Sequence, residues 1–184
     1  MNYASVKEYD IANGPGIRLT LFVSGCTHHC RECFNPETWS FSYGKPFTEE
    51  TADHLIALLK EDAYEGLTLL GGEPMEPVNQ AGLLPFLKRV RAECPDRTIW
   101  CFTGYLFDRD LLGETMKDVA ETRELLGLID VLVDGEFKIE EKDVTLLYKG
   151  SRNQRTIDVP RSLEKGEIVF WEPVGITISP KTHL

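Results

Sequence analysis

The chain has 184 residues, 42% of them hydrophobic and 27% charged, and its 30 acidic against 20 basic side chains give a formal net charge of −10. This composition predicts one globular domain, and the acidic balance argues against nucleic acid or an anionic membrane as the main partner, because phosphate binding needs a basic face. No apolar run reaches the roughly 20 residues of a membrane-spanning helix, and the start lacks the apolar core of a signal peptide. We therefore expect a cytoplasmic protein.

The first predicted elements are a strand, a helix and a second strand. The strand Arg18–Val23 leads directly into a loop that holds three cysteines. A helix is predicted after Thr48, which suits an N-cap, because two acidic residues and then apolar residues at i, i+3, i+4 and i+7 follow it. The second strand, Gly66–Leu70, ends in Gly-Gly-Glu-Pro.

The later elements continue this alternation. Apolar positions from Leu83 to Cys94 mark a second helix, which Pro95 ends. The strand Thr98–Phe102 is closed by Thr-Gly, and a helical region is expected over Asp108–Leu126. The fourth strand, Ile129–Val133, ends at Asp-Gly.

Strands separated by helix-length crossovers predict a parallel sheet of the α/β class. Four such units are too few for a closed eight-fold barrel, so we expect a partial (β/α) barrel of parallel strands with an additional β-containing C-terminal tail. The tail holds two β-like runs, Glu167–Trp171 and Gly175–Ser179, which we expect to cover a sheet edge; the alternative is a docking surface for another protein. We divide the chain into a domain of residues 1–155 and an extension of residues 156–184.

The three cysteines of the loop, Cys26, Cys30 and Cys33, have the spacing C-x3-C-x2-C. Thiolates at this spacing can surround one metal centre, and a 4Fe–4S cluster held by three of them would leave one iron open for an external ligand. The alternative is a structural zinc site with His28 or His29 as the fourth ligand. No second Cys/His pair follows downstream, which favours the cluster.

Candidate ligand-binding residues follow the predicted strands, whose carboxyl ends meet at one side of a parallel sheet. Gly71 and Gly72 allow close backbone approach, and Glu73 could receive an ammonium group, although a tight turn with a surface glutamate is the simpler interpretation. Thr103 could offer a hydroxyl to the same mouth. Asp134, at the carboxyl end of its strand, completes the set.

Other polar and sulfur residues near these motifs are open to structural interpretations. Cys94 and Cys101 suit small core positions. Asp130 is more simply a capping or turn residue. Arg18 is expected either at the surface or within reach of a carboxylate near the mouth.

Taken together, the motifs resemble those of the radical S-adenosylmethionine enzymes, and among them the activating proteins of anaerobic ribonucleoside-triphosphate reductases. The resemblance covers most of the first 155 residues. The segments that carry it are Asn13–Gly16, Leu21–Trp39, Gly71–Pro74, Ile99–Tyr105, Ile129–Gly135 and Gly150–Gln154.

The resemblance implies a cofactor and a reaction. Cys26, Cys30 and Cys33 would hold a 4Fe–4S cluster whose fourth iron binds the amino and carboxylate groups of S-adenosylmethionine. One electron from the cluster, supplied by a flavodoxin-type donor, would split the sulfonium into methionine and a 5′-deoxyadenosyl radical. That radical would take a hydrogen atom from a glycine of the reductase, and no protein residue beyond the cluster ligands would be catalytic.

The same resemblance implies roles for the other site residues. Gly71, Gly72 and Glu73 would line the methionine end, while Glu32 and Phe34 would lie beside the adenosyl portion. Which of the last two meets the adenine stays open, because the position before the third cysteine is commonly aromatic in these enzymes. Two other functions also remain possible, namely an activase of another glycyl radical enzyme of the formate-lyase type and a non-catalytic zinc-binding interaction module.

Overall fold

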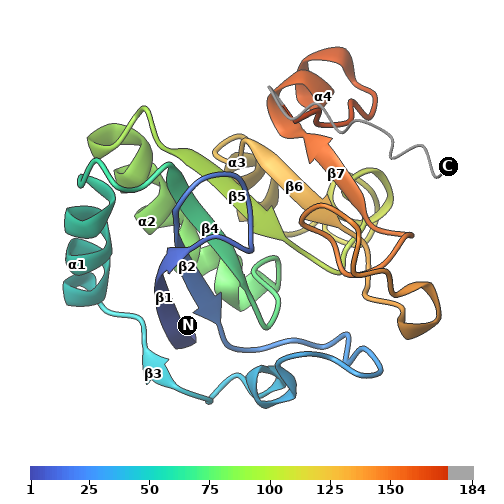
Figure 1. The fold of residues 1–184 in the computed structure, drawn as a ribbon, viewed down its shortest axis with the longest axis horizontal. Coiled ribbons are helices and arrows are strands. Elements are labelled where there is room, and N and C mark those ends of the chain that lie inside the picture. The colour runs from blue at the N-terminus through green and yellow to red at the C-terminus, as the bar shows by residue number, and fades with distance from the viewer. Residues whose placement is uncertain (174–184) are drawn as a thin grey trace, which may run out of the picture.

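The computed structural model describes residues 1–173 and is a mixed α/β structure built on one seven-stranded sheet. The sheet order is β3-β1-β2-β4-β5-β6-β7 (Figure 1). The strands are β1 (Asn2–Asp10), β2 (Arg18–Val23), β3 (Lys45–Pro46), β4 (Gly66–Gly71), β5 (Thr98–Phe102), β6 (Val131–Asp134) and β7 (Arg155–Asp158). No helix in this part of the chain is long and apolar enough to cross a membrane.

The middle of the sheet is parallel, as the alternation of strands and helices predicts. β2 pairs with β4, β4 with β5, and β5 with β6, all in parallel. The connections carry α1, α2 and α3 in turn, and the remaining helix, α4, follows β7. The helices are α1 (Glu49–Leu59), α2 (Pro77–Glu93), α3 (Glu121–Leu126) and α4 (Val159–Lys165).

The two faces of the central strands have different environments, because successive side chains of a strand point to opposite faces. Leu67 and Leu69 of β4 belong to the large core, which also holds Leu55 of α1 and Leu87 of α2. The alternate positions on the neighbouring strand β5 include Trp100, which belongs to a second, smaller cluster. The sheet is therefore covered by helices on one face, while its other face surrounds the cavity described below.

The first helix forms as its sequence pattern predicts. Thr48 caps it, since its side-chain oxygen accepts a hydrogen bond from the backbone N–H of Thr51. The apolar stripe of α1 is buried, with Leu55 and Leu59 at 0% exposure. Burying such leucine side chains stabilises the fold by about 1.5–3 kcal/mol each.

The helix expected over Asp108–Leu126 is wrong as a continuous element. A π-helical turn, Phe107–Leu111, comes first, and irregular turns separate it from the short helix α3. The Asp110 carboxylate accepts hydrogen bonds from the backbone N–H of Leu106 and the hydroxyl of Thr115. These local side-chain bonds compete with a regular helix in this segment.

Several elements near the two ends of the chain were not predicted. β1 pairs antiparallel with β2, and β7 pairs antiparallel with β6 at the other side of the sheet. The run Glu167–Trp171 does not form the expected strand but contributes a single antiparallel bridge between Phe170 and Ile157. The run Gly175–Ser179 lies outside the described residues.

Candidate functional site

A cavity of about 500 Å³ lies at the carboxyl ends of β2, β4, β5 and β6. The loops at the ends of these parallel strands were predicted to meet at one side of the sheet, and the cavity lies there. Eight of the ten predicted site residues line it, while Glu32 and Asp134 do not. The eight are Cys26, Cys30, Cys33, Phe34, Gly71, Gly72, Glu73 and Thr103.

The cysteine loop, residues 26–33, follows β2 and is held at its start by the backbone and by one buried carboxylate. The N–H of Cys26 donates to the carbonyl of Trp39 at 3.1 Å. The N–H of Thr27 donates at 2.8 Å to Oε1 of Glu76, a residue with 5% exposure. These contacts fix the direction in which the chain leaves the strand.

All five cysteines are free thiols, and the three of the loop share the wall of one cavity. Burial raises the pKa of Cys26 to about 11, and burial also raises the pKa of Cys30. Among residues 1–173, no three His, Cys, Asp or Glu side chains stand close enough together to hold a metal ion. Three soft sulfur donors within one short loop nevertheless fit an iron–sulfur cluster, whose binding would deprotonate the thiols and draw them together.

Gly71, the last residue of β4, and Gly72 lie closer to the neighbouring backbone than a residue with a Cβ could. Gly71 has a φ of +114°, and a Cβ on it would lie 2.7 Å from the backbone nitrogen and oxygen of Val23. A Cβ on Gly72 would lie 2.6 Å from the carbonyl oxygen of Gly25. The backbone of this segment therefore lies directly against the start of the cysteine loop, and it borders the cavity.

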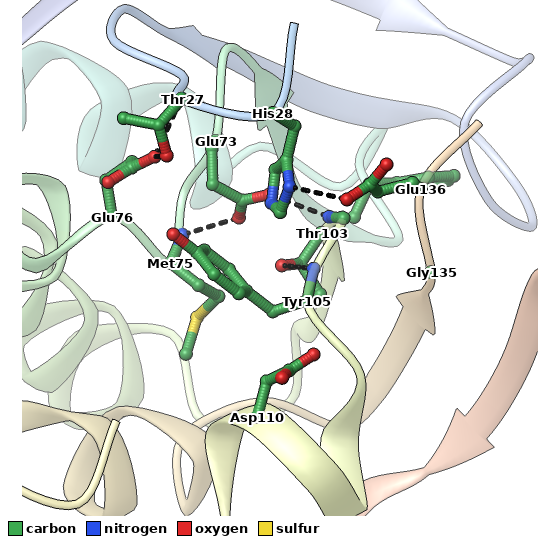
Figure 2. Close-up of polar contacts among 12 residues, drawn as sticks. Thr27, His28, Glu73, Met75, Glu76, Thr103, Tyr105, Asp110, Gly135 and Glu136 are labelled. Atoms are coloured by element: carbon green, nitrogen blue, oxygen red, sulfur yellow. Dashed lines mark hydrogen bonds and ion pairs between the residues drawn. The ribbon is translucent and has the colours of Figure 1, made fainter. Parts of the chain in front are cut away.

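Glu73 is a buried residue with 1% exposure, so the interpretation of a surface glutamate is wrong. One carboxylate oxygen, Oε1, accepts a hydrogen bond from the N–H of Met75 at 2.8 Å, and the other, Oε2, accepts one from the N–H of Gly104 at 2.7 Å (Figure 2). The side chain thus joins the loops after β4 and β5. Thr103 lies beside it, and its hydroxyl oxygen accepts a hydrogen bond from the N–H of Tyr105.

The two histidines of the cysteine loop have other partners than the cysteines. The His28 ring lies between two carboxylates, with Nδ1 3.1 Å from Glu136 Oε1 and Nε2 3.2 Å from Glu73 Oε2 (Figure 2). Burial lowers the pKa of His28, but the two carboxylates outweigh it and raise the pKa above its usual value. The His29 ring packs against Trp39 in a tilted arrangement, with centroids 4.6 Å apart.

Asp134 and Glu32 lie apart from the cavity wall. Asp134 is fully buried, and its carboxylate accepts hydrogen bonds from the side chain of Arg155 and the N–H of Phe107. Glu32 is exposed and has a φ of +59°. Phe34 is also 71% exposed but does line the cavity, and its ring lies 5.7 Å from that of Phe137.

Neither expectation for Arg18 is correct. Its side chain is fully buried at the start of β2, away from the strand ends that form the cavity. The guanidinium donates to the hydroxyl of Thr68 at 2.6 Å and to the carbonyl of Leu67 at 2.7 Å, and no carboxylate of residues 1–173 accepts a hydrogen bond from it. Asp130 has the structural role expected for it, because its Oδ2 accepts from the N–H of Ile99 and from Arg91.

One wall of the cavity was not predicted from the sequence. It comes from the irregular segment after β6, which contributes Phe137, Lys142, Tyr148 and Lys149. Gln154 joins this wall to the strand end, because its side-chain amide donates to the carbonyl of Gly135 at 2.9 Å. The segment has no hydrophobic period, and only the resemblance over Gly150–Gln154 pointed toward it.

The comparisons with known proteins show the family of this chain. Residues 12–157 match the family model described as a 4Fe-4S single cluster domain, which favours the cluster over zinc. The Pasteurella multocida protein named anaerobic ribonucleoside-triphosphate reductase-activating protein is 47% identical to this chain, over 84% of this chain and 95% of its own length. The Escherichia coli K12 protein of the same name is 43% identical, over 84% of this chain and 96% of its own length. The phage T4 protein of the same name is 37% identical over 84% of this chain and 92% of its own length. The chain therefore belongs to the family of anaerobic ribonucleoside-triphosphate reductase-activating proteins, within the 4Fe-4S single cluster domain family.

Proposed function

We propose that this protein is a glycyl-radical activase for an anaerobic ribonucleoside-triphosphate reductase. The observation that carries the proposal is the shared cavity, in which three free thiols face the strand-end segment Gly71–Glu73. A 4Fe–4S cluster bound there would supply one electron to S-adenosylmethionine, giving methionine and a 5′-deoxyadenosyl radical that takes a hydrogen atom from a glycine of the reductase. The names of the relatives support this choice of partner.

The proposed roles of the chain's own residues are to bind and orient. Cys26, Cys30 and Cys33 hold the cluster, and Gly71 and Gly72, which line the same cavity, border the methionine end of S-adenosylmethionine. Glu73 places one carboxylate in the cavity wall near that end.

We propose different roles for the remaining predicted site residues. Phe34 is favoured over Glu32 for the adenosyl contact, because only Phe34 lines the cavity. Thr103 offers a polar wall. Asp134 would act only indirectly, through the segments that its buried carboxylate joins.

Four further parts of the proposal concern the setting of the reaction. We infer that the sheet acts as a partial barrel, with its mouth at the cavity open to a glycine-bearing segment of the reductase. We also propose a flavodoxin-type electron donor and a cytoplasmic location, which the five free thiols support. We also propose that residues 1–155 carry the activase function and that residues 156–184 form an extension, although β7 crosses the boundary between them.

The first test is iron and sulfide analysis of anaerobically reconstituted protein, followed by the visible spectrum before and after dithionite. One 4Fe–4S cluster per chain, with a brown colour that bleaches on reduction, is the expected result. Stoichiometric zinc without colour would instead support the non-catalytic zinc module.

The second test adds S-adenosylmethionine and a partner to the reduced protein and looks for a glycyl radical by electron paramagnetic resonance. A signal on the anaerobic reductase is expected. A signal on a formate-lyase-type enzyme and none on the reductase would assign the chain to that other partner.

A further inference from the structure

His28 connects three loops that come from different parts of the sheet. It belongs to the cysteine loop, while its two carboxylate partners follow β4 and β6. Its ring also packs against the loop after β5, where a Cβ on Gly104 would lie 2.6 Å from the imidazole Cδ2 and Nε2. The Tyr105 ring closes the remaining side at a centroid distance of 4.4 Å. His28 is thus held from several directions, with 12% of its side chain exposed.

The contact with Glu73 is close, but its geometry is not that of a well-aligned hydrogen bond. The atoms Nε2 and Oε2 are 3.2 Å apart, yet Nε2 is buried and lacks a hydrogen-bond partner among the described residues. The ring is therefore held against Glu73 by its close packing as well as by its polar atoms. The same Oε2 accepts from the N–H of Gly104, and His28 therefore lies against a carboxylate whose position the sheet already fixes.

Beyond His28, the ion pair that joins the cysteine loop to the rest of the described chain lies at the surface. Arg31 pairs with Glu140 at 3.3 Å, but both side chains are more than two-thirds exposed, at 77% and 69%. Exposed pairs of this kind contribute little to the position of a loop. Thr27 bonds the buried Glu76 at the start of the loop, and His28 follows it with contacts to carboxylates from two other loops, two residues before Cys30.

We propose that His28 is a positioning residue, which bridges Glu73 and Glu136 and so holds the cysteine loop at the distance from Gly71–Glu73 that S-adenosylmethionine binding requires. The inference rests on the proposed function, because it assigns this role toward the same cavity. A substitution of His28 leaves the three thiols that would bind iron in place. We therefore expect it to change the affinity for S-adenosylmethionine and to leave iron binding intact.

The test compares two matched variants of the full chain, each reconstituted anaerobically with iron and sulfide. His28→Phe keeps a ring against Gly104 and removes both nitrogens. His29→Phe makes the same change one residue later, at a ring that packs against Trp39. Affinity is read from the change in the electron paramagnetic resonance spectrum of the reduced cluster as S-adenosylmethionine is added. His28→Phe is expected to retain its iron and to weaken binding about tenfold, while His29→Phe stays within about twofold of the parent protein.

Two further variants keep the outcome decisive if His28→Phe fails to fold or to take up iron. His28→Gln retains a donor toward the carboxylates and is expected to recover binding to within about threefold. Glu136→Gln alters a half-exposed side chain and is expected to weaken binding by about threefold. The role of His28 would be overturned if both His28→Phe and Glu136→Gln bound S-adenosylmethionine as tightly as the parent protein. It would also be overturned if His28→Gln bound S-adenosylmethionine no more tightly than His28→Phe. Failure of the parent protein to bind S-adenosylmethionine would instead refute the proposed function.

Discussion

Asp10 provides a test of the physical account of this fold at a distance from the cysteines. Its carboxylate is fully buried and accepts hydrogen bonds from Lys7, Ala12 N–H, Asn13 and Thr20. Burial would raise its pKa, but these four donors outweigh burial and lower the pKa to about 2. Asn13 borders the cavity, so Asp10 connects the end of β1 to the site.

The expected effect of Asp10→Asn follows from that pKa. A fall from 3.8 to about 2 corresponds to about 2 kcal/mol of folding free energy, since one pKa unit is worth about 1.4 kcal/mol. Because the pKa is lower in the folded state, this stabilisation is complete above about pH 4 and is lost as the pH falls toward about 2. The parent protein should therefore exceed the variant in stability by about 2 kcal/mol at pH 7, and the difference should shrink below about pH 4.

Urea unfolding at pH values from 7 down to 3 measures this difference. Asp62→Asn is the matched control, because Asp62 is fully exposed and lies 4.0 Å from its nearest cationic partner, Arg97. The control should unfold like the parent protein at every pH. A difference between the parent protein and Asp10→Asn that did not change with pH would show that the hydrogen bonds to Asp10 do not depend on its charge.

The remaining predictions concern the metal ligands and the packing around them. Cys30→Ala should abolish iron binding, while Cys94→Ala should retain it with a stability loss of about 1 kcal/mol; iron retained by Cys30→Ala would refute the ligand assignment. Gly71→Ala should lower the free energy of unfolding by about 3 kcal/mol, because its Cβ would meet backbone atoms at 2.7 Å. Gly127→Ala is the control: its Cβ would make only ordinary contacts from 3.4 Å, and its free energy of unfolding should be nearly that of the parent protein. Arg155→Met should cost about 3–5 kcal/mol in urea unfolding, because it leaves a buried carboxylate unpaired; a loss below about 1 kcal/mol would contradict that pairing.

The central part of the fold could be predicted because its signals are local. Arg18–Val23 and Thr98–Phe102 have the predicted strand bounds, and α1 begins directly after its predicted cap, Thr48. The convergence of the strand-end loops also followed from the sequence, because parallel strands joined by helices place their carboxyl ends on one side. That reasoning needs no knowledge of side-chain contacts.

The unpredicted parts depend on contacts between distant residues. β1 has mostly exposed or half-buried side chains, so its sequence lacks the apolar run of a buried strand. The roles of Glu73 and Asp134 could not be distinguished at the sequence level, since each follows a buried strand. The structure separates them, because Glu73 borders the cavity whereas Asp134 is enclosed by partners such as Arg155.

The two edges of the sheet differ in how they are protected from association with other molecules. Beyond β7, the chain returns to cover the edge, since Phe170 bridges Ile157 and the N–H of Trp171 donates to the carbonyl of Thr156. β1, in contrast, pairs on its outer side only at Asn2 and Tyr3 among the described residues. The rest of that edge carries charged side chains such as Lys7 and Glu8, which discourage a strand of a second molecule from adding to it. Self-association of this protein through its sheet would accordingly begin at β1, and it would be promoted by any change that removes those charges.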